Sequence, residues 1–171
     1  MKTPTNSNLP GGPESGGEER SGVPDAETNN TLGVIYASRG ETGFVAAAEY
    51  FQKAADQGHS MAQNNLALMH AAGLGMNKNW GEATRWFERG AAQGDAGAQY
   101  HLGVHCHRNS MMNDGPVRES RIEAYKWFQL AAQQGYWKAD VCLERVNLQM
   151  DREEVSEAAR RVSSFVVKKE N

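Results

Sequence analysis

The sequence predicts an all-α protein, built as a solenoid of about four antiparallel helix pairs. Three observations lead to this prediction. The segment YFQKAADQGHSMAQNNLA at residues 50–67 recurs as WFERGAAQGDAGAQYHLG at 86–103 and as WFQLAAQQGYWKADVCLE at 127–144. Its apolar residues follow the period of a helix, and each copy contains a glycine of the kind that ends one. A segment that recurs three times indicates a structural unit before it indicates a catalytic loop.

Residues 1–30 differ in composition from the rest of the chain. They are rich in Pro, Gly, Ser, Asn and Glu, contain no aromatic residue and carry a net charge of −3. So little apolar surface cannot offset the entropy lost on ordering the segment. We therefore expect residues 1–30 to form a disordered acidic tail.

Repeat units follow the tail from residue 31 to residue 150. Alignment on Gly58, Gly94 and Gly135 gives a spacing of 36 and then one of 41. The units span roughly 31–58, 59–94 and 95–135, and a last half-unit spans 136–150. The first unit begins with LGVIY at 32–36, which matches LGVHC at 102–106.

Each copy of the recurring segment reads as two helices joined by a tight turn at its glycine. In the middle unit one helical face gathers Ala83, Trp86, Phe87, Gly90 and Ala91. Small residues let two helix backbones approach closely, and the aromatic doublets fill the space between units. We expect these doublets, at 50–51, 86–87 and 127–128, to lie in the core. A single helix pair cannot bury its apolar face, and stacking of the units buries it.

Residues 151–171 are predicted to form a capping helix. Asp151 suits the N-cap, and Glu154 stands three residues later, as in a capping box. Glu144 replaces the small residues found at 67 and 103, so that another close crossing after it is disfavoured. The predicted apolar face of the capping helix comprises Val155, Ala158, Ala159, Val162, Phe165 and Val166.

The repeated pattern resembles that of the Sel1-like repeat family, a relative of the tetratricopeptide repeats. The middle unit supplies the family's characteristic positions: Ala62, Leu66, His70, Gly73-Leu74-Gly75, Ala83, Trp86-Phe87, Ala91 and Gly94. A spacing of 36 favours this family over the tetratricopeptide repeats, whose period is about 34. His70 and Cys106 stand where the family pattern has Tyr, and the third linker, 108–121, is five residues longer than the second. The resemblance implies a right-handed α/α superhelix.

The resemblance also implies that the first helix of each unit lines a concave face used for protein–protein interaction. Positions off the core stripe there are Val34, Ile35, Asn65, Leu68, Met69, His101, Val104 and His105. This mixture of apolar and polar residues is typical of a groove for a peptide or a partner helix. We expect an adaptor, chaperone-like protein or assembly factor that is monomeric alone and needs no cofactor. Met69 and His105, which correspond in successive units, are expected to share the binding face.

Two tryptophans break the repeat and are expected to be exposed. Trp80 and Trp137 lie outside the repeated aromatic doublets, and either could anchor a partner. For Trp80, packing over the preceding linker is an equally good alternative.

A metal or redox site is the first alternative function. His101 and His105 lie four residues apart on a predicted helix, beside Cys106 and His107. Such residues can ligate zinc, but no carboxylate or further Cys at metal spacing completes the set. Cys106 also takes the inward position of the repeat, so we expect no metal.

A hydrolase is the second alternative. Some secreted Sel1-like proteins have been described as penicillin-binding or β-lactamase-like, and they are rich in regularly spaced cysteine pairs. Here Cys106 and Cys142 fall at non-equivalent positions, and no GxSxG motif is present. We therefore expect a protein that is not an enzyme.

Composition gives the expected setting. No stretch approaches the ~20 apolar residues of a membrane span, and residues 1–12 lack the apolar region of a signal peptide. Two cysteines favour reduced thiols in the cytoplasm. Residues 31–171 have no net charge, which argues against nucleic acid as the main partner.

Overall fold

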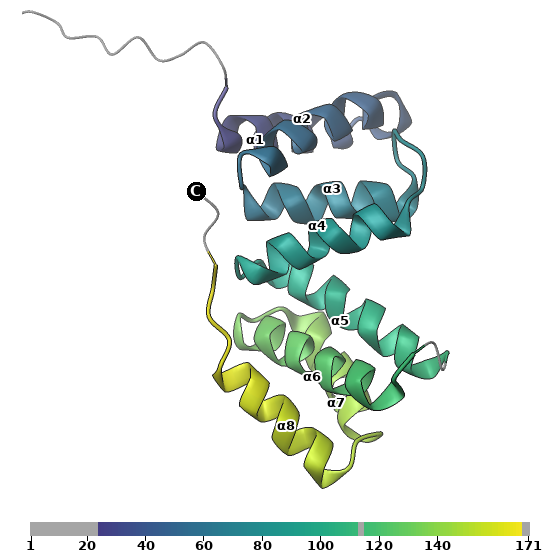
Figure 1. Ribbon diagram of the computed structural model, residues 1–171. Coiled ribbons are helices and arrows are strands. Elements are labelled where there is room, and N and C mark those ends of the chain that lie inside the picture. Colours follow the sequence, from purple (N-terminus) through teal and green to yellow (C-terminus); the bar gives the residue numbers. More distant parts are fainter. Residues whose placement is uncertain (1–23, 113–114, 169–171) are drawn as a thin grey trace, which may run out of the picture.

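The computed structural model describes residues 24–112 and 115–168. Within them the chain forms eight α-helices, one 3₁₀ turn and no strand (Figure 1). The elements are α1 (Ala26–Ala37), η1 (Gly40–Thr42), α2 (Phe44–Asp56), α3 (Ser60–Ala72), α4 (Trp80–Ala92), α5 (Ala96–Met111), α6 (Val117–Gln133), α7 (Trp137–Asn147) and α8 (Arg152–Ser163). The predicted all-α class is confirmed. None of these helices is long and apolar enough to cross a membrane.

The helices pair in chain order and the pairs stack. In each of three units a first helix (α1, α3 or α5) packs against its second helix (α2, α4 or α6), and α7 begins a fourth unit. Each second helix also packs on the first helix of the following unit. The stack runs from α1 and α2 at one end to α8 at the other (Figure 1). Because each unit packs mainly on its immediate neighbours in the chain, the molecule is built as a solenoid.

The turns between units all use a left-handed glycine. Gly58, Gly94 and Gly135 have φ values of 83°, 89° and 80°. This backbone region is disfavoured for residues with a Cβ, which is why the repeat carries glycine there. The next helix then starts within two residues, and the side chains of His59 and Asp95 cap α3 and α5. The predicted tight turn is confirmed.

The aromatic doublets divide between the core and its edge. The second ring of each doublet, Phe51, Phe87 or Phe128, is buried. Trp86 is also buried, but Tyr50 and Trp127 are only half-buried. Consecutive residues point about 100° apart around a helix, so both rings of a doublet rarely face the same neighbour. The expectation that all six rings belong to the core is therefore wrong for these two.

Buried glutamines connect the units through hydrogen bonds. Gln63 Nε2 donates to the carbonyl of Ala55 at 3.3 Å, and Gln63 Oε1 accepts from Gln93 at 2.8 Å. The following unit repeats both contacts with Gln99, Ala91 and Gln134. Gln63 and Gln99 are 0% and 1% exposed, so these bonds satisfy amides that burial would otherwise leave unpaired.

The first helix begins earlier than the sequence pattern indicates. Asp25 caps α1 by accepting a hydrogen bond from the backbone N–H of Thr28 at 2.8 Å, and Asn29 and Asn30 are buried. The predicted tail boundary at residue 30 is therefore wrong. A short polar cap followed by asparagines has the composition of a tail, although here it starts a helix. The expectation of disorder for residues 1–23 lies outside the described residues.

The predicted capping helix forms and departs from the repeat. Asp151 and Glu154 make the expected capping box at the start of α8. However, α8 packs on α6, whereas the second helix of every other unit packs on its own first helix. Of its predicted apolar face, Ala158 is buried and three side chains are half-buried, but Ala159 and Val166 are exposed.

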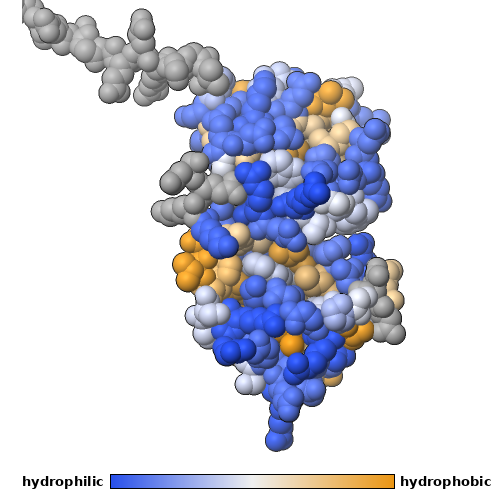
Figure 2. Space-filling view, viewed as in Figure 1, coloured by the Kyte–Doolittle hydropathy of each residue, from blue (hydrophilic) through white to orange (hydrophobic). Residues whose placement is uncertain are grey.

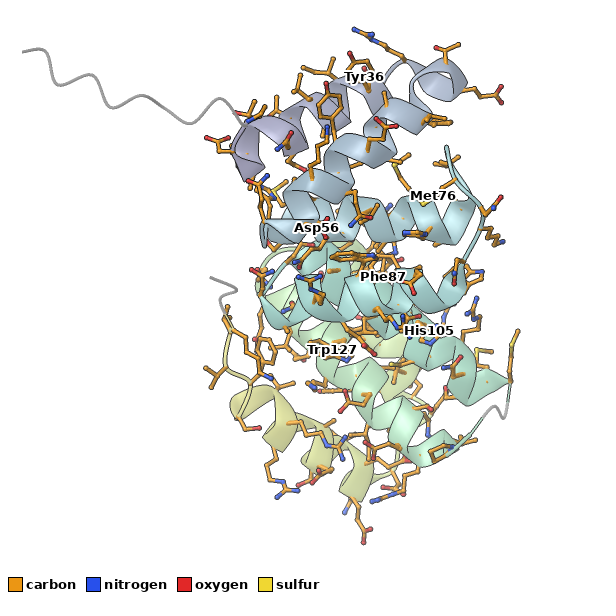
Figure 3. The ribbon with its side chains drawn as sticks, turned by 45° about the horizontal axis from the view of Figure 1, so that its top comes forward. Tyr36, Asp56, Met76, Phe87, His105 and Trp127 are labelled. Carbon is orange, nitrogen blue, oxygen red and sulfur yellow. The ribbon has the colours of Figure 1, made fainter. Side chains whose placement is uncertain are left out.

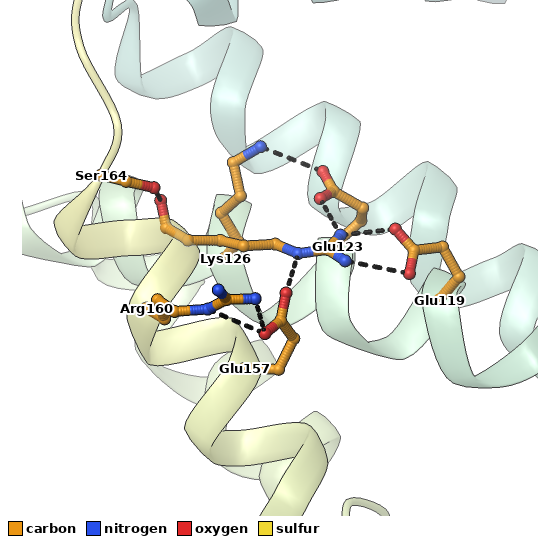
Figure 4. Close-up of polar contacts among 7 residues, drawn as sticks. Glu119, Glu123, Lys126, Glu157, Arg160 and Ser164 are labelled. Atoms are coloured by element: carbon orange, nitrogen blue, oxygen red, sulfur yellow. Dashed lines mark hydrogen bonds and ion pairs between the residues drawn. The ribbon is translucent and has the colours of Figure 1, made fainter.

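Ion pairs hold α8 on α6. Glu154 is 1% exposed and accepts from Arg121 at 2.6 Å. Arg161 of α8 contacts carboxylates from both helices, namely Glu119, Glu123 and Glu157 (Figure 4). The contact therefore depends on charge as well as on apolar packing.

After α8 the chain turns back along the stack. In this C-terminal segment (residues 164–168) Phe165 meets the ring of Trp127 edge-on, with centroids 5.7 Å apart. The backbone N–H of Lys168 donates to the carbonyl of Ala92, at the end of α4, at 2.8 Å. The segment's Val166 and Val167 are exposed, and Figure 2 shows apolar surface there. The C-terminal segment thus reaches two units back.

Candidate partner-binding groove

Two hollows open on the side of the first helices. The first hollow, of about 280 Å³, is lined by Val34, Ala37, Phe44, Phe51, Asn65, Leu68, Met69 and Leu74. The second hollow, of about 90 Å³, is lined by Leu68, Ala71, Trp80, Phe87, His101, Val104, His105 and Arg108. Leu68 belongs to both, so the hollows adjoin and are together called the groove. Figure 3 labels Phe87 of α4 and His105 of α5, which line the second hollow.

The two hollows are the same place in successive repeats. Repeat-equivalent residues are Val34 and Leu68, Ala37 and Ala71, Phe44 and Trp80, Phe51 and Phe87, Asn65 and His101, Leu68 and Val104, and Met69 and His105. The repeat therefore generates the groove, because the same helix geometry leaves the same space twice. Its chemistry is set by the residues that differ between the copies.

The second hollow carries the charged and ionisable groups. The Arg108 guanidinium stacks over the ring of Trp80, 4.7 Å from its centroid, and Lys78 approaches the same ring at 5.7 Å. His105 Nδ1 lies 3.4 Å from Nη2 of Arg108, and His105 Nε2 lies 3.2 Å from Nδ2 of Asn109. The lining of the first hollow contains no ionisable side chain. The groove is therefore apolar at one end and cationic at the other.

Burial keeps both histidines of the second hollow neutral near pH 7. Burial lowers the pKa of His101, and the charge of Lys138 acts in the same direction. Burial also lowers the pKa of His105, with a further lowering by Arg108 and an opposing effect of Glu88. Neutral imidazoles can donate and accept hydrogen bonds. The fixed positive charge at this end comes from Arg108 and Lys78.

Most of the sequence-predicted binding residues meet in the groove. Val34, Asn65, Leu68, Met69, His101, Val104 and His105 all line one of the hollows. Ile35, although 45% exposed, lines neither.

Met69 needs a correction. It is 4% exposed and forms part of the core, so the expectation that it lies on the free face beside His105 is wrong. Met69 follows Leu66 by three residues on α3, which turns it toward the same buried side. It contributes to the floor of the first hollow.

The two exposed tryptophans are placed differently. Trp80 and Trp137 are 42% and 71% exposed, which confirms the expected exposure. Trp80 opens α4 and lines the second hollow, where its counterpart in the preceding unit is Phe44. Trp137 opens α7 and lines neither hollow. Of the two, Trp80 belongs to the groove.

The structure gives the His-Cys cluster no metal geometry. Among residues 24–112 and 115–168, no three His, Cys, Asp or Glu side chains lie close enough to hold one ion. Cys106 packs against a core cluster, and burial raises the pKa of its thiol to about 12. Both ring nitrogens of His107 are buried without a hydrogen-bond partner, and burial lowers its pKa. These groups pack in the interior, and Cys106 and Cys142 are free thiols.

Comparison with known proteins places the fold in a recognised context. A model of the Sel1 repeat matches residues 44–59, 60–95 and 96–136. Over 82 residues the chain is 33% identical to "DAP3-binding cell death enhancer 1" of Rattus norvegicus, a match that covers 48% of this chain and 16% of that protein.

Similar chains are also found among solved structures. A protective antigen of uropathogenic Escherichia coli strains that displays an SLR fold has a TM-score of 0.72 and 26% identity. That alignment covers 82% of this chain and 30% of the antigen. A Sel1 repeat protein from Oxalobacter formigenes has a TM-score of 0.56 and 28% identity, over 69% of this chain and 47% of its own. The chain thus spans less than half the length of each relative.

Proposed function

Because the chain belongs to the Sel1 repeat family, we propose that it is an interaction module whose groove binds a segment of a partner protein. Sel1 repeat proteins generally mediate protein–protein interaction. In this proposal the chain is monomeric alone and acts as an adaptor, chaperone-like protein or assembly factor. The rat relative is named for binding another protein, which agrees in kind with a protein partner.

The exposed apolar side chains of the groove carry the proposal. Val34, Trp80 and Val104 are 49%, 42% and 39% exposed, and each lines one of the adjoining hollows. Contiguous exposed apolar surface with a polar rim marks interaction sites in soluble proteins. Hollows of about 280 and 90 Å³ are smaller than the 300–1,000 Å³ typical of small-molecule sites. They suit the side chains of a protein segment better than a whole metabolite.

Two groove variants and one control variant test the proposal. Val104→Glu, alone and with Leu68→Glu, places carboxylates on the groove. Val45→Glu is the control, because Val45 is 59% exposed on α2 and lines neither hollow. Each protein is used as bait in the native cell, and bound proteins are quantified by mass spectrometry.

We expect the parent and the control to retain the same partner and the groove variants to lose it. Circular dichroism and thermal melting confirm that each bait is folded. Equal recovery of every bound protein by parent and Val104→Glu would place the interaction on another surface.

A further inference from the structure

The second hollow has room for a single aliphatic side chain. Its volume of about 90 Å³ is smaller than an apolar cavity of roughly 150 Å³ that holds benzene. Leu68, Ala71, Phe87 and Val104 supply apolar walls. An aliphatic side chain suits these walls, because its burial there removes apolar surface from water.

Two cations stand beside this hollow without a carboxylate partner. Within the part of the chain that the structure describes, neither Arg108 nor Lys78 forms an ion pair with Asp or Glu. By contrast, Arg85, Arg121 and Arg161 each pair with a carboxylate. The Arg108 guanidinium lies over the indole of Trp80, and one of its nitrogens, Nη2, contacts His105 Nδ1 at 3.4 Å, so that other N–H donors of its five remain for a ligand. Such donors match the oxygens of a carboxylate.

The cations occupy one end of the groove only. The first hollow has the same shape by repetition, but its lining is uncharged, with Asn65 and Met69 where the second hollow has His101 and His105. Glu88, the carboxylate that acts on His105, lies on α4 and is exposed. A ligand that satisfies both hollows therefore needs apolar side chains along its length and a negative charge at one end.

We propose that the groove binds an acidic–aliphatic peptide segment, with Leu-, Ile- or Val-type side chains in the two hollows and an Asp or Glu carboxylate on Arg108 and Lys78. The inference rests on the proposed function and adds the chemistry of the partner. Successive first helices lie roughly 10 Å apart, so the two aliphatic residues stand about seven positions apart on a helical segment or three on an extended one.

Peptide display tests the inference with a defined probe. A phage library of random 12-residue peptides is selected on the full chain, and clones that also bind Leu68→Glu are removed. The remaining groove-dependent peptides are synthesised, and their affinities are measured for parent, Arg108→Glu and Lys53→Glu. Lys53 is the matched control, because it also lies over a half-buried aromatic ring, Tyr50 at 5.2 Å, lines neither hollow, and undergoes the same change in charge.

We expect the groove-dependent peptides to combine aliphatic residues with Asp or Glu. Arg108→Glu should weaken them roughly tenfold or more, since it puts like charges together, and Lys53→Glu should change affinity less than about twofold. Arg108→Gln serves as the milder variant if thermal melting shows that Arg108→Glu is unfolded.

Two failures are distinguishable. Groove-dependent peptides without acidic enrichment, or with equal affinity for parent and Arg108 variants, overturn the inference and leave the proposed function standing. A selection in which no peptide separates the parent from Leu68→Glu overturns the inference and counts against the groove as a binding site.

Discussion

Single residues set how closely the helices of a unit approach. A Cβ on Gly33 would lie 2.5 Å from the ring of Phe51, and one on Gly103 would lie 2.8 Å from the ring of Phe128. Ala67 holds the equivalent place in the middle unit and is fully buried. The glycine of the repeated Leu-Gly pair is thus explained by contact with the buried Phe of the doublet.

Replacement of Gly103 by Ala should destabilise the protein despite the better helix propensity of Ala. Propensity favours Ala by about 1 kcal/mol, but overlap with the buried Phe128 costs about 1–3 kcal/mol. We expect a net loss of up to about 2 kcal/mol in urea unfolding.

Gly81→Ala is the matched control. Gly81 is exposed on α4, and its new Cβ would meet only the side-chain oxygen of Asn79, at 3.3 Å. This variant should be as stable as the parent or more so. A Gly103→Ala protein more stable than the parent would show that Phe128 can move aside.

Half-buried histidines should make stability depend on pH. Burial lowers the pKa values of His70, His101, His105 and His107. Below the unfolded pKa of about 6.5 the unfolded chain binds more protons than the native one, so stability is lost as the pH falls. The free energy of unfolding should therefore be lower at pH 5.5 than at pH 7. Urea titrations at the two values measure the difference.

His107→Leu is the variant that isolates one contribution. Both nitrogens of His107 are buried and unpaired, so its replacement removes a proton-binding group without breaking a side-chain hydrogen bond. The loss of stability between pH 7 and pH 5.5 should be smaller in this variant. An unchanged difference would mean that other groups cause the pH dependence.

The alignment of the repeats was enough to predict the positions of most core and groove residues. It placed the core alanines, the turn glycines and the groove positions, because repetition reports them several times. It misplaced Met69, since a residue at the border of the apolar stripe is decided by packing with the neighbouring helix. The buried Gln63 and Gln99 were missed, although the recurrence of Gln at the same place in successive units was a visible signal.

The type and order of the helices were predictable from the sequence, but the helix on which each one packs was not always predictable. The capping box located the start of α8, and its apolar residues indicated a buried face. An amphipathic pattern does not say which helix covers that face. The pairing of α8 with α6 depends on Arg121 and Arg161, whose carboxylate partners on the other helix are distant in the chain.

Loss of the Arg121 side chain should loosen α8. Arg121→Met leaves the carboxylate of Glu154 buried without its cation, and breaking a buried pair in this way costs about 3–5 kcal/mol. Arg118→Met is the control, because Arg118 and Glu153 are both exposed and 3.6 Å apart, where a pair contributes less than about 1 kcal/mol.

Amide hydrogen exchange measures the loosening of α8 directly. The amides of α8 should exchange faster in Arg121→Met than in the parent, while α1 to α4 keep their protection. Equal protection of α8 in Arg121→Met and Arg118→Met would show that apolar packing alone holds the helix.

At the scale of the whole molecule, the repeat units pack mainly on neighbouring units, but the C-terminal segment reaches two units back. It links α8 to the end of α4 through Lys168 and covers Trp127 with Phe165. A chain that ends after Ser164 should melt a few degrees lower, at roughly 2–4 °C per kcal/mol for a chain of this size. The amides at the end of α4 should also exchange faster.

A chain that ends after Lys168 is the control, because it keeps every described contact of the segment. Trp127 fluorescence gives a second reading, since loss of Phe165 exposes its ring to water. Identical melting of the two truncated chains would mean that the segment adds no stability.

The two hollows have the same shape but different charge, and this difference also affects the direction in which a bound segment lies in the groove. A groove with two identical recesses would accept a regularly spaced ligand head-first, tail-first or displaced by one unit, at nearly equal affinity. Arg108 and Lys78 remove this ambiguity, because only one alignment of an acidic–aliphatic segment brings its carboxylate to Trp80. Sequence divergence between repeats thereby gives a symmetric scaffold a polarity, and a bound partner would leave the solenoid in one fixed direction.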